Sequence, residues 1–327
     1  MNALSRNRRR LLWAGALAAL LLPALATAQT YPSHSVKIIV PFAAGGPADI
    51  YARYVGDRLS ASLGQAFVID NRPGAGSLIG TEAVAKSSPD GYTLLLISNT
   101  QTVNETLIPN KSYSLLRDFV PVAPINYSDL LLVVNPDTGI KSLADLLARA
   151  RATPGKLNYA SSGPGTPYHM AGELLKSMAK IDVQHVPYKG SAGARNDVIG
   201  GQVDMMFDAI STMAEQVKAG KVRAIASSGR QRSDVLPEVP TLAEAGVPGF
   251  DATIWLGLLA PKGTPRAIVT QLNAAISAIA SQPEVRQAWS KQGAVPLVMG
   301  PDVFEKYLQD DVRKWAGVIQ SAHIKLD

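Results

Sequence analysis

The apolar residues of this chain fall into two patterns that alternate along the sequence. Short continuous runs rich in Val, Ile and Leu, such as 36–42 (VKIIVPF) and 92–98, are typical of buried parallel strands. Between these runs, apolar residues recur every three or four positions, as between Pro47 and Gly64, which is typical of helices with one buried face. The alternation predicts an α/β protein with mostly parallel central sheets.

One order of elements occurs twice, in residues 36–98 and again in residues 157–207. It reads strand, turn rich in Gly or Pro, helix, strand, Gly-rich turn, helix, strand. We interpret the two copies as two similar βαβαβ units, although the sequence identity between them is low.

Two segments connect these units. Residues 118–136 are strand-rich and lie between the two copies, and residues 220–229 leave the second copy. Two chain crossings between two α/β units are typical of a hinged protein with a cleft. We therefore expect one lobe from residues 29–124 and 226–327, a second from residues 125–225, and a ligand cleft between them.

The first 28 residues have the composition of a secretory signal peptide. A basic start is followed by an apolar run over residues 11–22 and by Ala26-Thr27-Ala28; the basic residues are Arg6, Arg8, Arg9 and Arg10. The apolar run of 12 residues is too short to span a hydrocarbon core of about 30 Å. We expect export and cleavage near Ala28; a signal anchor stays open, as does the choice between the general secretory and twin-arginine routes.

Composition and charge narrow the possible functions. The chain has 327 residues, 46% of them hydrophobic, and a formal net charge of +6 that falls to +2 if the four arginines are cleaved off. The basic excess therefore does not indicate a nucleic-acid partner. The sequence has no Cys, which excludes disulfides, a catalytic thiol and Cys-ligated metals. His34, His185 and His323 are scattered, so we expect neither a metal site nor a cofactor.

Two strand-to-helix turns, residues 42–49 and 161–169, offer backbone N–H groups where a helix begins. Ligands of open parallel sheets bind beyond the carboxyl ends of strands, and a helix N-terminus favours an anion. Neither turn contains Arg or Lys. In one interpretation a small carboxylate is held between the two turns by backbone donors, hydroxyls such as Thr166, and water. In the other, Gly and Pro only make tight turns.

Four charged or titratable residues near these turns are open to two interpretations each. Asp49 is either a dipole partner in the first turn of its helix or a contact for an ammonium or hydroxyl group of a ligand. Asp208, at a strand end, is equally ambiguous. His169 either caps and packs or touches the ligand, and Lys189 either adds positive potential or is merely solvated.

Motifs of common enzymes are absent from the sequence. There is no G-x-S-x-G, H-E-x-x-H or G-x-x-x-x-G-K-[ST]. Residues 74–80 read G-x-G-x-x-x-G, but the next strand ends in Ser98-Asn99 and lacks the acid that a dinucleotide site needs. We expect a binding protein and not an enzyme. An exported hydrolase and a structural or surface-interaction protein stay open.

Eight stretches carry a resemblance to a known family. In order along the mature chain they are PFAAGGPADIYAR, VIDNRPGAGSLIG, YASSGPGTPYHMAGELL, HVPYKGSAGA, GGQVDMMFD, LPEVPTLAEAGVPGF, WLGLLAPKGTP and PEVRQAWSKQGAVP. They are similar to the extracytoplasmic binding proteins of tripartite tricarboxylate transporters, the Bug family.

The resemblance implies a periplasmic-binding-protein-like fold of two α/β lobes joined by a hinge. It implies a monomer in the periplasm that captures a small carboxylate by hinge closure and delivers it to a membrane permease. In the alternative, the protein has no dedicated transporter and acts as a ligand sensor for a signalling partner. Di- and tricarboxylates, acidic amino acids and aromatic carboxylates all stay open as ligands.

The resemblance also implies which residues contact the ligand, and none of them is catalytic. The first turn supplies Phe42, Ala43, Ala44, Gly45, Gly46 and Asp49, and the second supplies Ser161, Ser162, Gly163, Gly165, Thr166 and His169. Supporting positions are Gly76, Ser77, Ser98, Asn99, Thr100, Lys189, Gly190 and Asp208.

Overall fold

A computed structural model describes residues 31–322 and 324–325 of the chain. The chain divides into a unit that ends at Ser33 and a second unit that begins at His34, and the fold given below is that of the second unit. The predicted signal peptide, residues 1–28, lies outside the described residues. Within the described part of the chain, no helix is both long and apolar enough to cross a bilayer.

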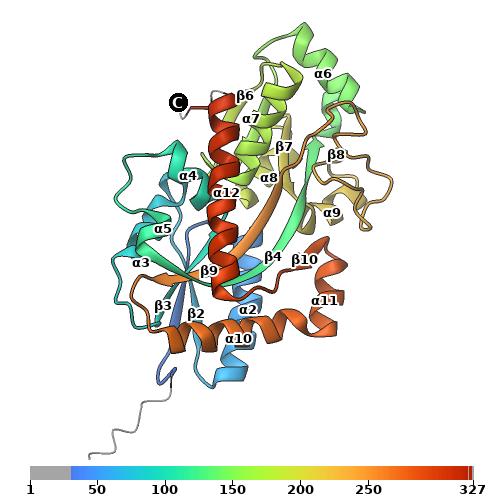
Figure 1. Cartoon of the computed structure of the whole chain (residues 1–327). Helices are drawn as coiled ribbons and strands as arrows, with labels where there is room; N and C mark the ends of the chain where they lie inside the picture. The colour runs from blue at the N-terminus through green and yellow to red at the C-terminus, as the bar shows by residue number, and fades with distance from the viewer. Residues whose placement is uncertain (1–30, 323, 326–327) are drawn as a thin grey trace, which may run out of the picture. The chain divides into compact units, whose positions relative to one another are not determined.

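Strands and helices alternate through the second unit (Figure 1). The strands are β1 (Val36–Val40), β2 (Phe67–Asn71), β3 (Thr93–Ser98), β4 (Phe119–Val134), β5 (Asn158–Ser161), β6 (Gln184–Pro187), β7 (Met205–Ala209), β8 (Arg223–Ser227), β9 (Thr253–Pro261) and β10 (Ala294–Pro296). The helices are α2 (Pro47–Leu63), α3 (Leu78–Ala85), α4 (Asn99–Leu107), α5 (Leu115–Asp118), α6 (Leu143–Ala152), α7 (Pro167–Ala179), α8 (Ser191–Ile199), α9 (Ile210–Lys218), α10 (Arg266–Ser281), α11 (Pro283–Ser290) and α12 (Pro301–Ser321), with single 3₁₀ turns at η2 (Ala75–Ser77) and η3 (Pro136–Thr138).

The strands form one ten-stranded sheet in the order β2-β1-β3-β9-β4-β7-β5-β6, with β8 and β10 also paired to β4. The α/β class is confirmed, but the sheet is mixed. Pairing is parallel within β2-β1-β3 and within β6-β5-β7, and antiparallel wherever β4 or β9 takes part. Both parallel sets place the first strand of the repeat between the second and the third, so the predicted repeat has the same topology in its two copies.

The long strand β4 connects the two parts of the sheet. Its residues as far as Asp129 pair with β9, and its residues from Leu130 onward pair with β7 and β8. The chain between β8 and β9 bonds to β4 at the same place, because Ser228 N–H donates to the carbonyl of Leu130 at 2.8 Å. Both connecting segments therefore pass the same point of the sheet.

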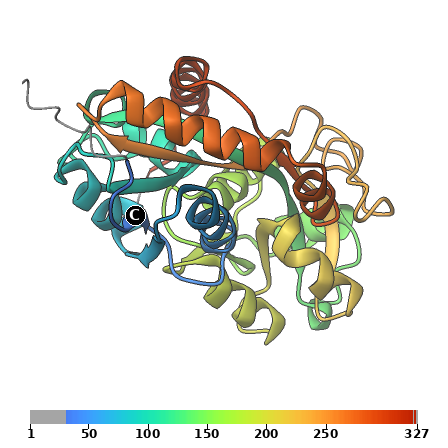
Figure 2. The same ribbon diagram turned by 90° about the horizontal axis from the view of Figure 1, so that it is seen from below.

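The helices cover the sheet and bury one face each. The helix α2 begins with Pro47 in its first turn and ends at Gly64, whose positive φ of 71° closes the last turn. The long helix α10, orange in Figure 2, packs against α2 and β4. The helix α4, which is polar and lacks an apolar stripe, is not among the predicted elements.

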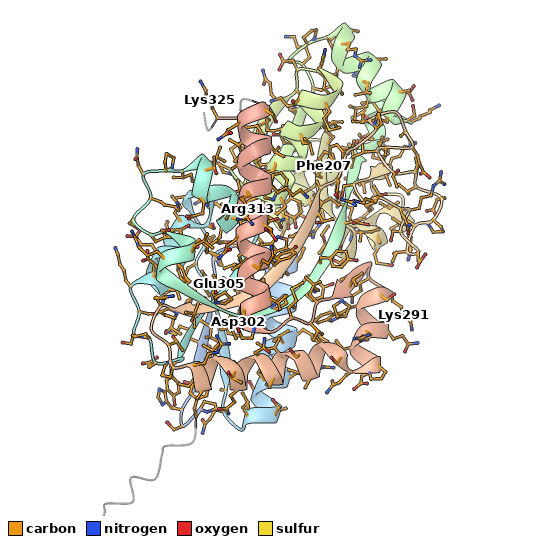
Figure 3. The ribbon with its side chains drawn as sticks, viewed as in Figure 1. Phe207, Lys291, Asp302, Glu305, Arg313 and Lys325 are labelled. Atoms are coloured by element: carbon orange, nitrogen blue, oxygen red, sulfur yellow. The ribbon has the colours of Figure 1, made fainter. Side chains whose placement is uncertain are left out.

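The C-terminal helix α12 stands against α4 and β4 (Figure 1). Most of its charged side chains, among them Asp302, Glu305 and Arg313, are exposed (Figure 3), as the 3.6-residue period of an amphipathic helix requires, whereas Asp311 is buried. Trp315 on its buried face packs with Val103 of α4 and with Met170 of α7. The helix thus contacts α7 of the second copy and α4, which directly follows the first copy.

Candidate functional site

Four helices begin around one small cavity, which we call the inner cavity. Residues at the beginnings of α2, α4, α7 and α8 line it together with two apolar residues of β9; the lining residues are Phe42, Ala43, Gly46, Pro47, Ala48, Ser98, Ser162, Pro167, Tyr168, Ser191, Ile254 and Leu256. The centre of a water molecule has about 20 Å³ of room there. That is space for one or two waters.

Two of these four helices begin without a side-chain cap. The first N–H groups of a helix have no partner within the helix, and a side chain, water or ligand must accept them. Ser98 caps α4 together with Gln101, and Thr166 caps α7. The N-cap residues of α2 and α8 are Gly46 and Gly190, which have no side chain to offer.

The beginnings of α2 and α8 face each other at close range. A Cβ atom at Gly46 would lie 2.9 Å from Ser191 Oγ, and one at Gly190 would lie 2.8 Å from Ala43 Cβ. The Ala43 N–H donates to the Lys189 carbonyl at 3.3 Å. Glycine is therefore required at Gly190 for this approach, since a Cβ there would meet the other turn itself, whereas a Cβ at Gly46 would meet the Ser191 hydroxyl, which can rotate away.

The electrostatics of the inner cavity favour an anion. Each helix N-terminus carries about half a positive charge, so two uncapped N-termini that face each other repel. Among the described residues that line the cavity, none has a charged side chain. An anion between the two helices would accept their N–H groups and remove the repulsion.

Tyr168 also lines this cavity and carries a buried hydrogen-bond donor. Its side chain is buried, its hydroxyl has no hydrogen-bond partner among the described residues, and it lies near Ser191 and Asp208. Burial raises the pKa of Tyr168 well above its usual value, and the neighbouring Asp208 adds to this shift. The phenol therefore keeps its proton, and a buried donor without an acceptor is costly unless a ligand accepts from it.

The two acidic candidates form ion pairs within the protein. Asp49 accepts hydrogen bonds from Gly45 N–H at 3.0 Å and from Arg53 Nε at 3.0 Å. Burial raises the pKa of Asp49, but these donors outweigh the burial and hold the pKa below its usual value. Asp208 is fully buried and lies 2.7 Å from the Arg195 guanidinium. Burial raises the pKa of Asp208, and Arg195 opposes that rise. Neither carboxylate lines the inner cavity.

His169 also serves the local structure of its turn. Its Nδ1 accepts from Gly165 N–H at 3.1 Å, and its ring stacks on His185 with centroids 4.2 Å apart. Burial lowers the pKa of His169 to about 4, with a smaller contribution from Lys176, so the ring is neutral at neutral pH. It lines a separate surface cavity with Glu173 and His185.

A second cavity, which we call the outer cavity, shares the walls formed by Phe42 and Ser162 with the inner one. It has a volume of about 480 Å³. Of the predicted site residues, the inner cavity is lined by Phe42, Ala43, Gly46, Ser98 and Ser162, and the outer cavity by Phe42, Gly76, Ser77, Ser162, Gly163, Thr166 and Lys189. These residues, far apart in the sequence, are brought together.

The remaining predicted residues line neither cavity; they are Ala44, Gly45, Asp49, Asn99, Thr100, Ser161, Gly165, His169, Gly190 and Asp208. Several have structural partners. Asn99 accepts from Trp255 N–H at 3.0 Å, and Ser161 Oγ lies 2.6 Å from His185 Nε2. Contact of any predicted residue with a ligand stays a prediction.

Sequence reasoning missed seven residues at the inner cavity, namely Pro47, Ala48, Pro167, Tyr168, Ser191, Ile254 and Leu256. Tyr168 and Ser191 follow directly on a Gly- or Pro-rich turn, which is a signal that was available. Ile254 and Leu256 lie on β9 and gave no signal, because only pairing with β3 and β4 brings that strand to the cavity.

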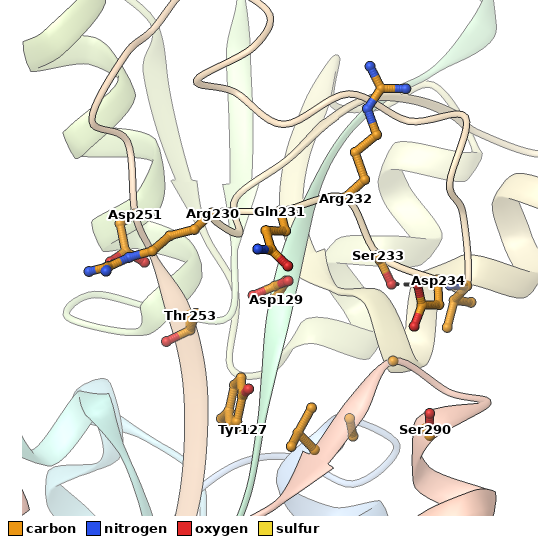
Figure 4. A pocket seen from close by; sticks show the side chains of 14 residues that line it. Tyr127, Asp129, Arg230, Gln231, Arg232, Ser233, Asp234, Asp251, Thr253 and Ser290 are labelled. Atoms are coloured by element: carbon orange, nitrogen blue, oxygen red, sulfur yellow. Dashed lines mark hydrogen bonds and ion pairs between the residues drawn. The ribbon is translucent and has the colours of Figure 1, made fainter.

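A third cavity, about 610 Å³, lies where β4 changes its partners (Figure 4). Its lining includes Asp129, Asp251 and Arg230. Burial raises the pKa of Asp129 to about 6, and the negative charge of Asp251 adds to the shift. None of the sequence-predicted site residues lines it. Within the described residues there is also no cluster of three or more His, Cys, Asp or Glu that could hold a metal.

Several known proteins are similar to this chain in sequence and in fold. The sequence pattern of the tripartite tricarboxylate transporter family receptors matches residues 51–324. Protein BugT of Bordetella pertussis is 39% identical over 302 residues, which cover 92% of this chain and 93% of BugT. The structure of Rpa4515 from R. palustris with adipate has a TM-score of 0.87 at 34% identity, covering 90% of this chain and 99% of that one. MatC (Rpa3494) from Rhodopseudomonas palustris with bound malate has a TM-score of 0.84 at 34% identity, covering 88% and 100%.

The fold is that of a periplasmic binding protein. More closely, the chain belongs to the tripartite tricarboxylate transporter receptor family, and the resemblance to Bug proteins is confirmed. Members of this family are solute-binding receptors of membrane transporters, which places the function of this chain in solute binding in the periplasm.

Proposed function

We propose that this protein captures a small carboxylate in the inner cavity by closing two lobes on it, and delivers the ligand to a membrane transporter. In this proposal residues 1–28 are removed on export, and the mature chain acts as a monomer in the periplasm. The lobes comprise residues 29–124 with 226–327, and residues 125–225. The hinge lies where β4 exchanges β9 for β7 and β8, because both connecting segments pass there.

One observation carries the proposal: the uncapped beginnings of α2 and α8 face each other across a cavity lined, among the described residues, by no cation. A carboxylate between them would accept N–H groups from both helices, and the hydroxyls of Tyr168 and Ser191 lie within the same wall. The ligand then belongs to both lobes. It stabilises the closed form because only that form offers both sets of donors.

The size of the inner cavity sets the order of events. Room for one or two waters does not admit a ligand while the turns at Ala43 and Lys189 are in contact. The ligand therefore enters while the turns are apart, and the turns then close on its carboxylate, whose two oxygens take the room of one or two waters. Bound adipate and malate in the related Rpa4515 and MatC support a carboxylate as the ligand.

The experiment compares each carboxylate with its uncharged amide. Mature protein is unfolded, freed of ligand, refolded and titrated calorimetrically with benzoate and benzamide, and with hexanoate and hexanamide. We expect binding of acids only, and a ligand at 100 times its Kd should stabilise the protein by about 2.7 kcal/mol. Equal binding of acid and amide would refute an anion site.

Tyr168→Phe provides a specific test of the donor that faces the cavity. We expect it to weaken carboxylate binding by about tenfold, the worth of one buried hydrogen bond, without loss of stability in the absence of ligand. The matched control is Tyr113→Phe, because Tyr113 is also buried with no hydrogen-bond partner for its hydroxyl among the described residues, and lies in the core beside Phe119. The control should bind like the wild type.

A further inference from the structure

We infer that the outer cavity is the subsite for an apolar body of the ligand, so that this chain selects carboxylates by their apolar part and not by their number of carboxylate groups. The inference rests on the proposed function, because the inner cavity must first hold one carboxylate. It commits to the chemistry of the second part of the ligand, which the family membership of the chain leaves open.

The sizes of the two cavities divide the ligand between them. The inner cavity has about 20 Å³ for the centre of a water molecule, and the outer cavity has about 480 Å³. The outer volume lies in the range of pockets that hold small organic ligands. Because Phe42 and Ser162 line both cavities, a ligand whose carboxylate reaches the inner one has its body in the outer one.

The walls of the outer cavity are mainly carbon. They are formed by Pro41, Leu78, Ile108, Pro164 and the ring of Tyr188, each from a different turn or helix end. Burial of an alkyl or aryl group of the ligand against such a surface tightens binding, because the group leaves water. The affinity rises about fourfold for each CH₂ that is buried.

Three of the four hydroxyl side chains that line this cavity already make hydrogen bonds within the protein. Ser77 Oγ accepts from Gln101 Nε2 at 3.1 Å, Thr166 Oγ1 donates to the Gly163 carbonyl at 2.7 Å, and the Tyr188 hydroxyl donates to Asp197. A hydroxyl group on the ligand body would give up its hydration for fewer hydrogen bonds than water provides, because most of these hydroxyls already have a partner. Hydroxylated acids such as malate and citrate are therefore disfavoured relative to acids with a plain hydrocarbon body.

A second carboxylate gains little in this cavity. Lys189 is the one charged residue among the described residues that line it, and its side chain is exposed. An ion pair in that position is screened by water and changes the affinity by no more than about fivefold. Mono- and dicarboxylates with the same hydrocarbon body should consequently bind alike.

The test is a chain-length series measured by calorimetry, with weak members measured in competition against the tightest. From acetate through butanoate to hexanoate we expect about fourfold tighter binding per methylene. Adipate should bind within about fivefold of hexanoate, and malate and citrate at least tenfold more weakly than hexanoate. Flat affinities along the series, or malate tighter than hexanoate, would overturn the inference.

Variants separate the two cavities. Ile108→Asn should flatten the series and leave the affinity for acetate unchanged, since Ile108 lines only the outer cavity. Ile79→Asn is the matched control, because Ile79 lines neither cavity and is 55% exposed, and it should keep the full slope. If Ile108→Asn does not fold, Ile108→Ala should reduce the gain in affinity per methylene by a smaller but measurable amount.

The outcomes distinguish the two proposals. Two outcomes would overturn the apolar subsite and leave the proposed function intact. In one, carboxylates bind with an affinity that does not depend on chain length. In the other, the Ile108 variants keep the full gain in affinity per methylene. Failure of every carboxylate to bind to folded protein would overturn the proposed function, and the subsite with it.

Discussion

Gly190→Ala is a substitution that acts on closure of the turns and on little else. The φ of Gly190 is 175°, an extended conformation that any residue adopts, so Ala brings no backbone strain. Its Cβ would lie 2.8 Å from Ala43 Cβ and 3.3 Å from Ala43 N. The obstacle is the other turn itself and not the end of a flexible side chain.

The magnitude follows from these distances. Non-bonded carbon atoms pack at about 3.5–4.0 Å, so the turns must separate by about 0.7 Å or more, which breaks the bond between Ala43 N–H and the Lys189 carbonyl. Overpacking costs about 1–3 kcal/mol and a lost hydrogen bond about 0.5–1.5 kcal/mol. A cost of about 1.5–4.5 kcal/mol on the closed form alone raises the Kd by about 10- to 1,500-fold.

The assay is calorimetric titration with the tightest carboxylate, alongside thermal unfolding without ligand. We expect a large loss of affinity and an unchanged Tm. Gly317→Ala is the control, because nothing lies within 4 Å of a Cβ at this exposed position of α12; it should bind normally and be slightly more stable. Wild-type affinity in Gly190→Ala would show that the contact between the turns plays no part in capture. A matching loss of stability without ligand would show that the contact belongs to the fold.

Two further predictions concern pH. The pKa of Asp129 is raised from 3.8 to about 6, so the stability gained from its protonated form is full below about pH 4 and lost as the pH rises through 6. In urea unfolding, the free energy of unfolding of Asp129→Asn relative to that of the wild type should therefore rise by up to about 3 kcal/mol between about pH 4 and about pH 8. A difference independent of pH would contradict this. The pKa of His169 is lowered from 6.5 to about 4, so the stability from its neutral form is full above about pH 6.5 and lost as the pH falls through 4. In His169→Gln this acid-side loss of about 3 kcal/mol should disappear, and identical pH profiles would rule out His169 as its source.

The sequence alone determined the elements whose signals are local. Pro47 in the first turn of α2 and Gly64 at its end mark that helix, and the strands β1 and β3 are visible as continuous apolar runs. Such signals depend on neighbours within a few residues, which a single sequence displays. The polar helix α4 escaped detection, because buried hydrogen bonds such as that between Ser98 and Gln101 replace an apolar stripe.

The two turns were also found from the sequence, whereas the roles of their polar residues were decided by tertiary structure. Asp49 is held by Arg53 on its own helix, a pairing at a spacing of four that the sequence already permits. Asp208 is held by Arg195, and His169 by Gly165 and His185, so burial and pairing turn these groups into structural ones.

Tertiary structure alone brought Ile254 of β9 beside Tyr168 of α7 at the inner cavity. It also set the uncapped beginnings of α2 and α8 face to face. The physical reason is that partners, burial and the direction of helix dipoles depend on distances between segments that lie far apart in the sequence. Those distances are set by strand pairing through β4 and by packing of the whole sheet, which no local pattern specifies.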